Sequence, residues 1–188
     1  INGVTNWYVG VDNSVNDIFS ISKQGTLESP ALAIDGSSNV GIGNPAPGNN
    51  LEVSKVSGAA TLELSSWSTT ATESHAGKIV LSKSGIATLN TFGAGAHTTA
   101  GEILGRIEGW GTTNDGDGSS DISKLSSYIE FANDAVSREG TVPGKIIFAT
   151  APDSDDAVPV ERMVIYDDGK MTTSAPAIHI RATSYNTN

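Results

Sequence analysis

One phrase of the sequence returns in diverged form near the end of the chain. Shifted by 131 positions, Leu32–Ile34 aligns with Met163–Ile165 without a gap, and Pro45 aligns with Pro176. Each copy reads as a short strand, a tight polar turn, a second short strand and a proline that ends it. Because so small a unit cannot bury a core of its own, it needs neighbours along the chain or from other chains. The repeat therefore favours an assembled, fibrous protein over a self-contained enzyme.

The composition leads to the same expectation. Of the 188 residues, 37% are hydrophobic, 6% are aromatic and 21 are glycine. Large apolar side chains are too scarce for a thick core within one chain, yet the strand patterning is too regular for a disordered one. Trimerisation would resolve this conflict, since each chain would share the apolar faces of its neighbours. The sequence opens at Ile1 in what resembles the middle of a β structure, so we expect a piece of a longer protein.

Charge and cysteine content exclude several classes of partner and site. The formal net charge is −10, which would repel nucleic acid and anionic membrane surfaces. The absence of cysteine excludes a disulfide framework and a zinc–thiolate site. No window of the sequence approaches the roughly 20 apolar residues of a membrane span, and the first residues do not resemble a signal peptide. We expect neither nucleic-acid binding nor membrane insertion.

Alternation of apolar and polar residues predicts about ten short strands and almost no helix, which is typical of an all-β fold. The predicted strands span residues 7–11, 18–22, 31–34, 50–53, 60–65, 77–82, 101–110, 127–132, 145–149 and 162–166. In one of them, Ile129 and Phe131 are expected to face inward and Glu130 outward. The best helical candidate, Ser120–Ser127, is short and rich in serine, so it predicts one turn at most.

The pattern divides into three zones. Residues 1–50 are predicted to form a short-repeat β shaft, residues 51–160 a β-sandwich-like domain, and residues 161–188 a second shaft segment. Proline-containing stretches at 44–50 and 151–159 should end strand pairing, because proline cannot donate to a ladder. The predicted architecture is an elongated homotrimeric fibre segment, with shaft parts on both sides of the sandwich-like unit.

The string that most resembles a metal site spans residues 114–121. Asp115, Asp117 and Asp121 place oxygen donors at positions that suit Ca²⁺. The spacing is not that of an EF-hand, because no glutamate follows to close the loop. A solvated turn is the preferred interpretation, with bound Ca²⁺ as the alternative, and we expect no other cofactor.

No catalytic constellation stands out. The histidines share no spacing, no serine lies in a nucleophile elbow, and the paired carboxylates lie in turns. These side chains are His75, His97 and His179, and Asp153, Asp155, Asp156, Asp167 and Asp168. The sequence therefore predicts that the protein is not an enzyme.

The tryptophans are candidates for sugar contacts, since aromatic planes pack on pyranose rings. Trp7 and Trp110 lie in predicted strands, where we expect them to anchor a core. Trp67 lies in a Ser/Thr-rich segment and is the predicted exposed residue and receptor contact. Gly41 and Gly43 do not precede a helix and are not a phosphate loop. We expect them to let three chains approach one another closely.

The phrase Leu32–Pro47 resembles the "IDssGNVGIGtxsP" element that recurs in tail fibres and related structural proteins of tailed bacteriophages. Further elements of that group are similar and follow in the same order, at residues 104–111, 127–131, 142–153 and 161–165. The resemblance covers about residues 7–53 and 101–172. The second copy of the repeat departs from the pattern after Gly169, so its geometry there is expected to differ.

This resemblance implies an elongated homotrimer on the virion, an extracellular particle, in contact with other virion proteins. Longer members of the group end in an intramolecular chaperone, which nothing in this sequence resembles. The function it implies is that of a non-enzymatic structural protein, a fragment of a trimeric tail fibre or of a head or capsid fibre. Such a fibre forms a rigid appendage and attaches to a host-surface glycan or protein, through many weak contacts that act together.

Two other functions remain open. One is a bacterial extracellular adhesin or carbohydrate-binding surface module that carries the same repeat. The other is a polysaccharide depolymerase tailspike, which the absence of a long solenoid repeat with grouped acids disfavours.

Overall fold

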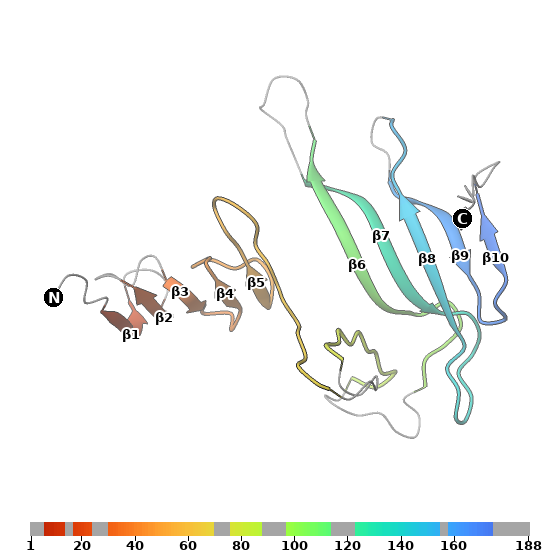
Figure 1. Ribbon diagram of the computed structural model, residues 1–188, viewed down its shortest axis with the longest axis horizontal. Helices are drawn as coiled ribbons and strands as arrows, with labels where there is room; N and C mark the ends of the chain where they lie inside the picture. The colour runs from red at the N-terminus through yellow and green to blue at the C-terminus, as the bar shows by residue number, and fades with distance from the viewer. Residues whose placement is uncertain are drawn as a thin grey trace, which may run out of the picture. The chain divides into compact units, whose positions relative to one another are not determined.

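The computed structural model describes residues 6–13, 17–23, 30–69, 76–87, 97–113, 123–154 and 158–174. Over these residues the chain forms ten strands and no helix, which confirms the predicted all-β class. Consequently, no helix in the described part is long and apolar enough to cross a membrane. The chain divides into two compact units, residues 1–78 and 79–188, and each contains one sheet (Figure 1).

The first sheet has five strands in chain order. They are β1 (Trp7–Asp12), β2 (Ile18–Lys23), β3 (Pro30–Ile34), β4 (Val40–Ile42) and β5 (Leu51–Val53). Strands β1 to β4 form an antiparallel meander, and β5 pairs with β4 in parallel. The parallel pairing requires a crossover, which the proline-containing loop between β4 and β5 supplies.

The second sheet also has five strands, all antiparallel. They are β6 (Ile103–Thr112), β7 (Ser123–Asn133), β8 (Gly144–Thr150), β9 (Val160–Ile165) and β10 (Met171–Thr173), with β6 and β10 at the edges. Strands β9 and β10 therefore extend the sheet that contains β6 to β8. The domain boundaries predicted after residues 50 and 160 remain predictions.

The repeated phrase forms the same hairpin in both sheets. Strand β3 pairs with β4, and β9 pairs with β10, in one register when the 131-residue shift is applied. The equivalent pairs are Leu32–Ile42 and Met163–Thr173, Ala33–Gly41 and Val164–Thr172, and Ile34–Val40 and Ile165–Met171. The sequence repeat is therefore a structural repeat.

The turns of the two hairpins are also equivalent. The amide of Ser38 donates to the carbonyl of Asp35 at 2.9 Å, and the amide of Gly169 donates to the carbonyl of Tyr166 at 3.0 Å. Ser38 and Gly169 both have positive φ, 67° and 79°, which glycine adopts without strain and serine seldom does. The two hairpins keep one register as far as Thr173, so the difference expected after Gly169 is not found over these residues. At the next position Gly43 has positive φ, whereas Ser174 does not.

The equivalence extends to two further strands. Val9 pairs with Ile21 between β1 and β2, as Ile129 pairs with Phe148 between β7 and β8. The register shift that follows Ile21 in the β2–β3 ladder recurs after Phe148 in the β8–β9 ladder. We name β1–β4 the first module and β7–β10 the second module. Strand β5 extends the first module beside β4, and β6 extends the second module beside β7.

Three predictions of local structure are wrong. Residues 60–65 and 77–82 are not strands, although a side chain at Gly77 would overlap the carbonyl of Leu64. These stretches come close without forming a ladder, and a strand needs hydrogen-bonded neighbours to persist. The predicted helical turn is also wrong over its described part, because Ser123–Ser127 pairs with β6 in strand β7.

Candidate functional site

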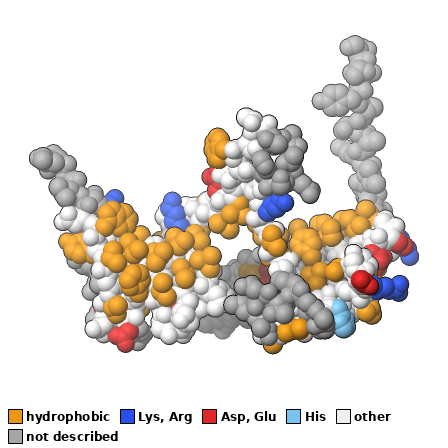
Figure 2. Space-filling model, turned by 90° about the horizontal axis from the view of Figure 1, so that it is seen from below, with side chains coloured by type: hydrophobic (Ala, Val, Ile, Leu, Met, Phe, Trp, Pro, Cys, Tyr) orange, Lys and Arg blue, Asp and Glu red, His pale blue; other side chains and the backbone are white. Residues whose placement is uncertain are grey.

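One face of the first sheet carries large apolar side chains that the chain does not bury. They form two rows across all five strands, Val9–Ile21–Leu32–Ile42–Val53 and Val11–Phe19–Ile34–Val40–Leu51. None of them is buried, whereas Ser20, Ser22 and Ala33 on the other face are fully buried. Figure 2 shows hydrophobic side chains gathered over the part of the molecule that holds this sheet. We name this surface the first apolar face.

The second sheet repeats this arrangement. Its rows are Ile107–Ile129–Phe148–Met163 and Phe131–Ile146–Ile165–Met171, and none of these side chains is buried. Buried side chains again belong to the other face, where Ala132, Ile147, Ala149 and Val164 lie. We name this surface the second apolar face. In both sheets, the large side chains that would make a core are thus left partly in solvent.

The two modules preserve their apolar faces more strictly than their other faces. Equivalent positions of the rows are apolar in both modules, for example at Val11 and Phe131, with one exception, since Ile42 is equivalent to Thr173. On the other face, by contrast, Gly10 is equivalent to Glu130, and Ser20 to Ile147. A surface that stays apolar while the rest of the strand varies is under a constraint that a solvent-facing surface would not impose.

An extended segment borders the second apolar face. Ile79, Val80 and Leu81 line a cavity of about 310 Å³ together with Ile107 and Phe131. Leu81 packs directly on the backbone of Gly105, where any side chain would overlap it. Ile79 and Val80 remain largely exposed. The segment therefore adds apolar surface to the face and does not seal it.

The opposite face of the second sheet bears a polar and aromatic cluster on β6 and β7. Arg106 Nε donates to Glu130 Oε2 at 2.9 Å, and its guanidinium carbon lies 4.2 Å from the ring centre of Tyr128. Arg106 Nη1 also reaches Glu108 Oε1 at 3.4 Å, and Trp110 Nε1 donates to Glu108 Oε2 at 2.9 Å. We name these five residues the β6 strip.

Burial of Glu130 in this cluster corrects a prediction. Glu130 was expected to face outward, yet it is only 6% exposed, while Ile129 and Phe131 are not buried. Arg106 makes this burial possible, because a buried carboxylate needs an opposite charge that donates hydrogen bonds to it. The hydrogen bond with Glu130 in turn raises the pKa of Arg106, against the opposing effect of its desolvation.

The tryptophans lie differently from the prediction. Trp7 is 59% exposed and Trp110 is 60% exposed, so neither anchors a core within the chain. The alternating pattern places both residues on strands, but it cannot show whether another layer covers that face. Trp67 is 95% exposed, and its role as a receptor contact remains a prediction.

The close approach at Gly41 also differs from the prediction, because it occurs within one chain. A side chain at Gly41 would overlap the carbonyl of Asn44 in the loop that leads to β5. Gly43 has φ of 75°, and a side chain there would overlap the carbonyl of Ser54. These glycines therefore serve the crossover between β4 and β5.

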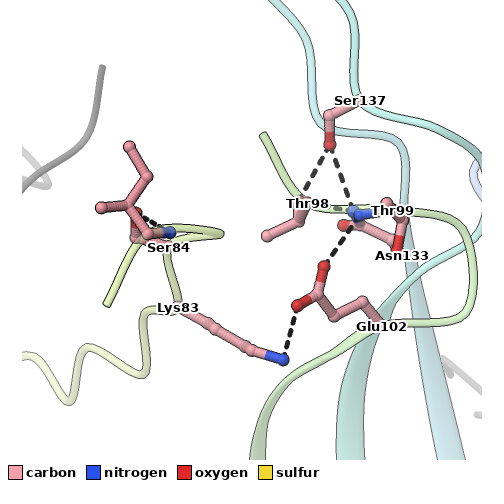
Figure 3. Close-up of polar contacts among 8 residues, drawn as sticks. Lys83, Ser84, Thr98, Thr99, Glu102, Asn133 and Ser137 are labelled. Carbon is pink, nitrogen blue, oxygen red and sulfur yellow. Dashed lines mark hydrogen bonds and ion pairs between the residues drawn. The ribbon is translucent and has the colours of Figure 1, made fainter. Parts of the chain in front are cut away.

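A buried polar cluster fixes the end of β7 (Figure 3). Asn133 is fully buried, and its Nδ2 donates to Thr98 Oγ1 at 2.6 Å and to Ser137 Oγ at 3.1 Å. Beside it, Glu102 accepts from the amide of Thr99 at 2.8 Å and pairs with Lys83 at 2.5 Å. These contacts with Lys83 and Thr99 lower the pKa of Glu102. The cluster ties the segment before β6 to the end of β7.

The remaining predicted sites give no constellation. The candidate Ca²⁺ ligands Asp115, Asp117 and Asp121 lie outside the described residues, as do His75, His179, Asp155 and Asp156. His97 and Asp153 are exposed, and so are Asp167 and Asp168 in the turn between β9 and β10. Among the residues that the structure describes, no group of three or more His, Asp or Glu side chains could hold a metal ion.

Comparisons with known proteins find a likeness in structure only. No family model matches the sequence, and no curated protein matches it. The chain is similar to the carboxy-terminal domain of the bacteriophage T5 L-shaped tail fibre, with a TM-score of 0.56 and 10% identity, over 100% of this chain and 76% of that chain. It is also similar to a structure of that domain with its intramolecular chaperone domain, with a TM-score of 0.52 and 10% identity, over 100% of this chain and 51% of that one. At the level of fold, the chain resembles the carboxy-terminal domain of a phage tail fibre.

Proposed function

We propose that the protein is a non-enzymatic segment of a phage tail fibre, which assembles as a homotrimer and forms part of a rigid appendage for attachment to a host. The observation that carries this proposal is the pair of apolar faces. Each face is built from equivalent positions of a duplicated module, and neither is buried within its own unit. The fold of the T5 tail-fibre domain supports the same role.

Self-association is the simplest way to cover these faces. Aliphatic and aromatic side chains gain about 25 cal/mol for each Å² of apolar surface removed from water. Over two rows on each of two sheets, this gain supplies the driving force that the small buried core cannot. A second copy of the chain offers matching faces, since closed symmetric assemblies use the same patches on every subunit.

Oligomeric mass tests the proposal directly. We expect light scattering coupled to size exclusion to give three times the 19.3 kDa chain mass. Val9→Lys and Met171→Lys each place a charge on an apolar face, at positions that are 65% and 52% exposed in the chain. Because these exposed positions are covered only in the assembly, both variants should lose assembly and, with it, the stability that the small core of one chain cannot supply.

The matched control is Ser37→Lys, which adds the same charge in the exposed turn between β3 and β4. This variant should assemble as the unaltered protein does. A stable, fully folded single chain in dilute solution would contradict the proposal.

A further inference from the structure

Strand β6 is what the second unit adds to the module that both units share, and the β6 strip lies on β6 and on its neighbour β7. The two modules differ at a position that faces β6. Gly10 of the first module is replaced by Glu130 at the equivalent position of the second, and Glu130 binds Arg106 of β6. Tyr8 and Tyr128 are equivalent, and in the second module the guanidinium of Arg106 packs over the Tyr128 ring. The buried glutamate therefore accompanies β6 and fixes the charged part of the strip.

Trp110 is exposed and yet held in place. Its single N–H donor is already bonded to Glu108, and Glu108 in turn is held by Arg106. The polar end of the indole therefore needs no further partner, and the exposed surface that remains is apolar ring. A rigid ring of this kind loses little conformational entropy when a ligand packs on it.

A cavity of mixed polar and apolar lining begins at Gly111, the residue after Trp110 on β6. Leu125 pairs with Trp110 across the β6–β7 ladder and lines this cavity of about 340 Å³ at the ends of β6, β7 and β8. The residues that line the same cavity include Thr112, Ser126 and Ser154, each of which has a side-chain hydroxyl. This volume lies at the lower end of the range for small-molecule sites, which is about 300–1,000 Å³.

We propose that the β6 strip and this cavity bind a neutral saccharide. A pyranose ring would pack on the Trp110 indole, with sugar hydroxyls bonded to Glu108, Arg106 and the hydroxyls of the cavity. Charge favours a neutral ligand, because Glu108 and Glu130 flank the guanidinium of Arg106, Lys124 adds a single cation at the cavity, and the whole chain carries −10. The strip has no run of aliphatic side chains of the kind found on the apolar faces, which disfavours a protein partner.

This inference rests on the proposed function. In an assembly whose copies meet through the second apolar face, the opposite face of that sheet remains free to meet a host surface. Identical strips on several copies would then act together, so that weak single contacts would give durable attachment.

A glycan array tests the inference on the full chain. The probes are neutral hexose oligosaccharides, with sialylated and sulfated oligosaccharides on the same surface. We expect binding to at least one neutral probe, a loss of tenfold or more for Trp110→Ala, and a loss of a few fold for Glu108→Gln. Glu139→Gln removes an exposed carboxylate from a loop of the same unit and should bind as the unaltered protein does.

The variants separate this inference from the proposal on assembly. Trp110→Ala should keep the oligomeric mass of the unaltered protein, so a loss of binding at constant mass supports the strip. Equal binding by Trp110→Ala and the unaltered protein would overturn the inference. The inference would also be overturned if Trp67→Ala lost binding while Trp110→Ala kept it. Binding of the unaltered protein to the anionic probes alone, or to no saccharide, would overturn it as well. None of these outcomes bears on whether the chains assemble.

Discussion

The first and second modules share a backbone and differ in what is built beside it. Both have the same strand order, the same register, the same bulge and the same positive φ in the turn. The first module continues through a glycine-dependent crossover into β5, whereas the second carries the long charged strand β6. Both modules thus present an apolar face, and the added strands extend that face and give each unit its own chemistry.

Exchanging the residues at one equivalent position should give the largest difference in stability between the modules. Gly41→Thr places a side chain against the carbonyl of Asn44, so the crossover must move, at a cost of about 3 kcal/mol. Thr172→Gly, the reverse change in the second module, removes a side chain without a collision and should cost about 1 kcal/mol. Urea denaturation monitored by circular dichroism compares the two, and equal costs would contradict the role given to Gly41.

The buried ion pair should produce the next largest effect. Glu130→Gln leaves Arg106 without its main partner and should reduce the free energy of unfolding by about 2 kcal/mol. A double-mutant cycle with Arg106→Met isolates the interaction from the other effects of each change. A coupling energy near zero would mean that Glu130 is not held in place by β6.

The turns should differ by a smaller amount. Asp35 Oδ1 accepts from the amides of Ser37 and Asn39, at 2.9 and 2.8 Å. In the second module, Asp168 Oδ1 accepts from the amide of Lys170 at 2.8 Å, and Tyr166 stands where Asp35 does. Asp35→Ala should therefore lower the melting temperature more than Asp168→Ala does, because Asp35 accepts two backbone hydrogen bonds and Asp168 accepts one. Thermal unfolding measures both melting temperatures. A larger decrease for Asp168→Ala than for Asp35→Ala would contradict this ranking.

Acid should produce the smallest of these differences in stability between the two hairpins. The amide of Asn39 above all lowers the pKa of Asp35, so the stability that this carboxylate contributes is lost as the pH falls below about 3.8. Desolvation and the nearby Asp134 raise the pKa of Asp167, so protonation of Asp167 relieves a cost of the folded state as the pH falls. Between pH 5 and pH 2, the β3–β4 turn should weaken relative to the β9–β10 turn. Hydrogen exchange of the equivalent Ser38 and Gly169 amides measures this difference, and parallel changes at both would contradict it.

Part of this comparison could be predicted from the sequence. The hairpins could be found because turn residues and alternation are local signals, and because the β3–β4 and β9–β10 turns have one length. The two preceding strands of each module were predicted, but their equivalence was not, because longer loops in the second module shift Ile129 and Phe148 away from the 131-residue spacing. A comparison that allowed insertions between strands would have aligned them.

The site could be predicted less well, for a different physical reason. Alternation shows which residues share a face, but not which face other parts of the protein cover. That is why Trp110 was assigned to a core and Glu130 to solvent. The burial of Glu130 depends on Arg106, a residue far away in the sequence that pairing across the β6–β7 ladder brings within hydrogen-bonding distance.

The unequal connections of the two modules bear on how such a protein can be re-engineered. The link between β1 and β2 runs from Asp12 to Ile18, whereas the equivalent link runs from Asn133 to Gly144, and the ladders on either side keep their pairing. Lengthening a surface connection costs little chain entropy, which grows only with the logarithm of its length. The β1–β2 connection is therefore a natural place to graft a foreign epitope or an affinity tag.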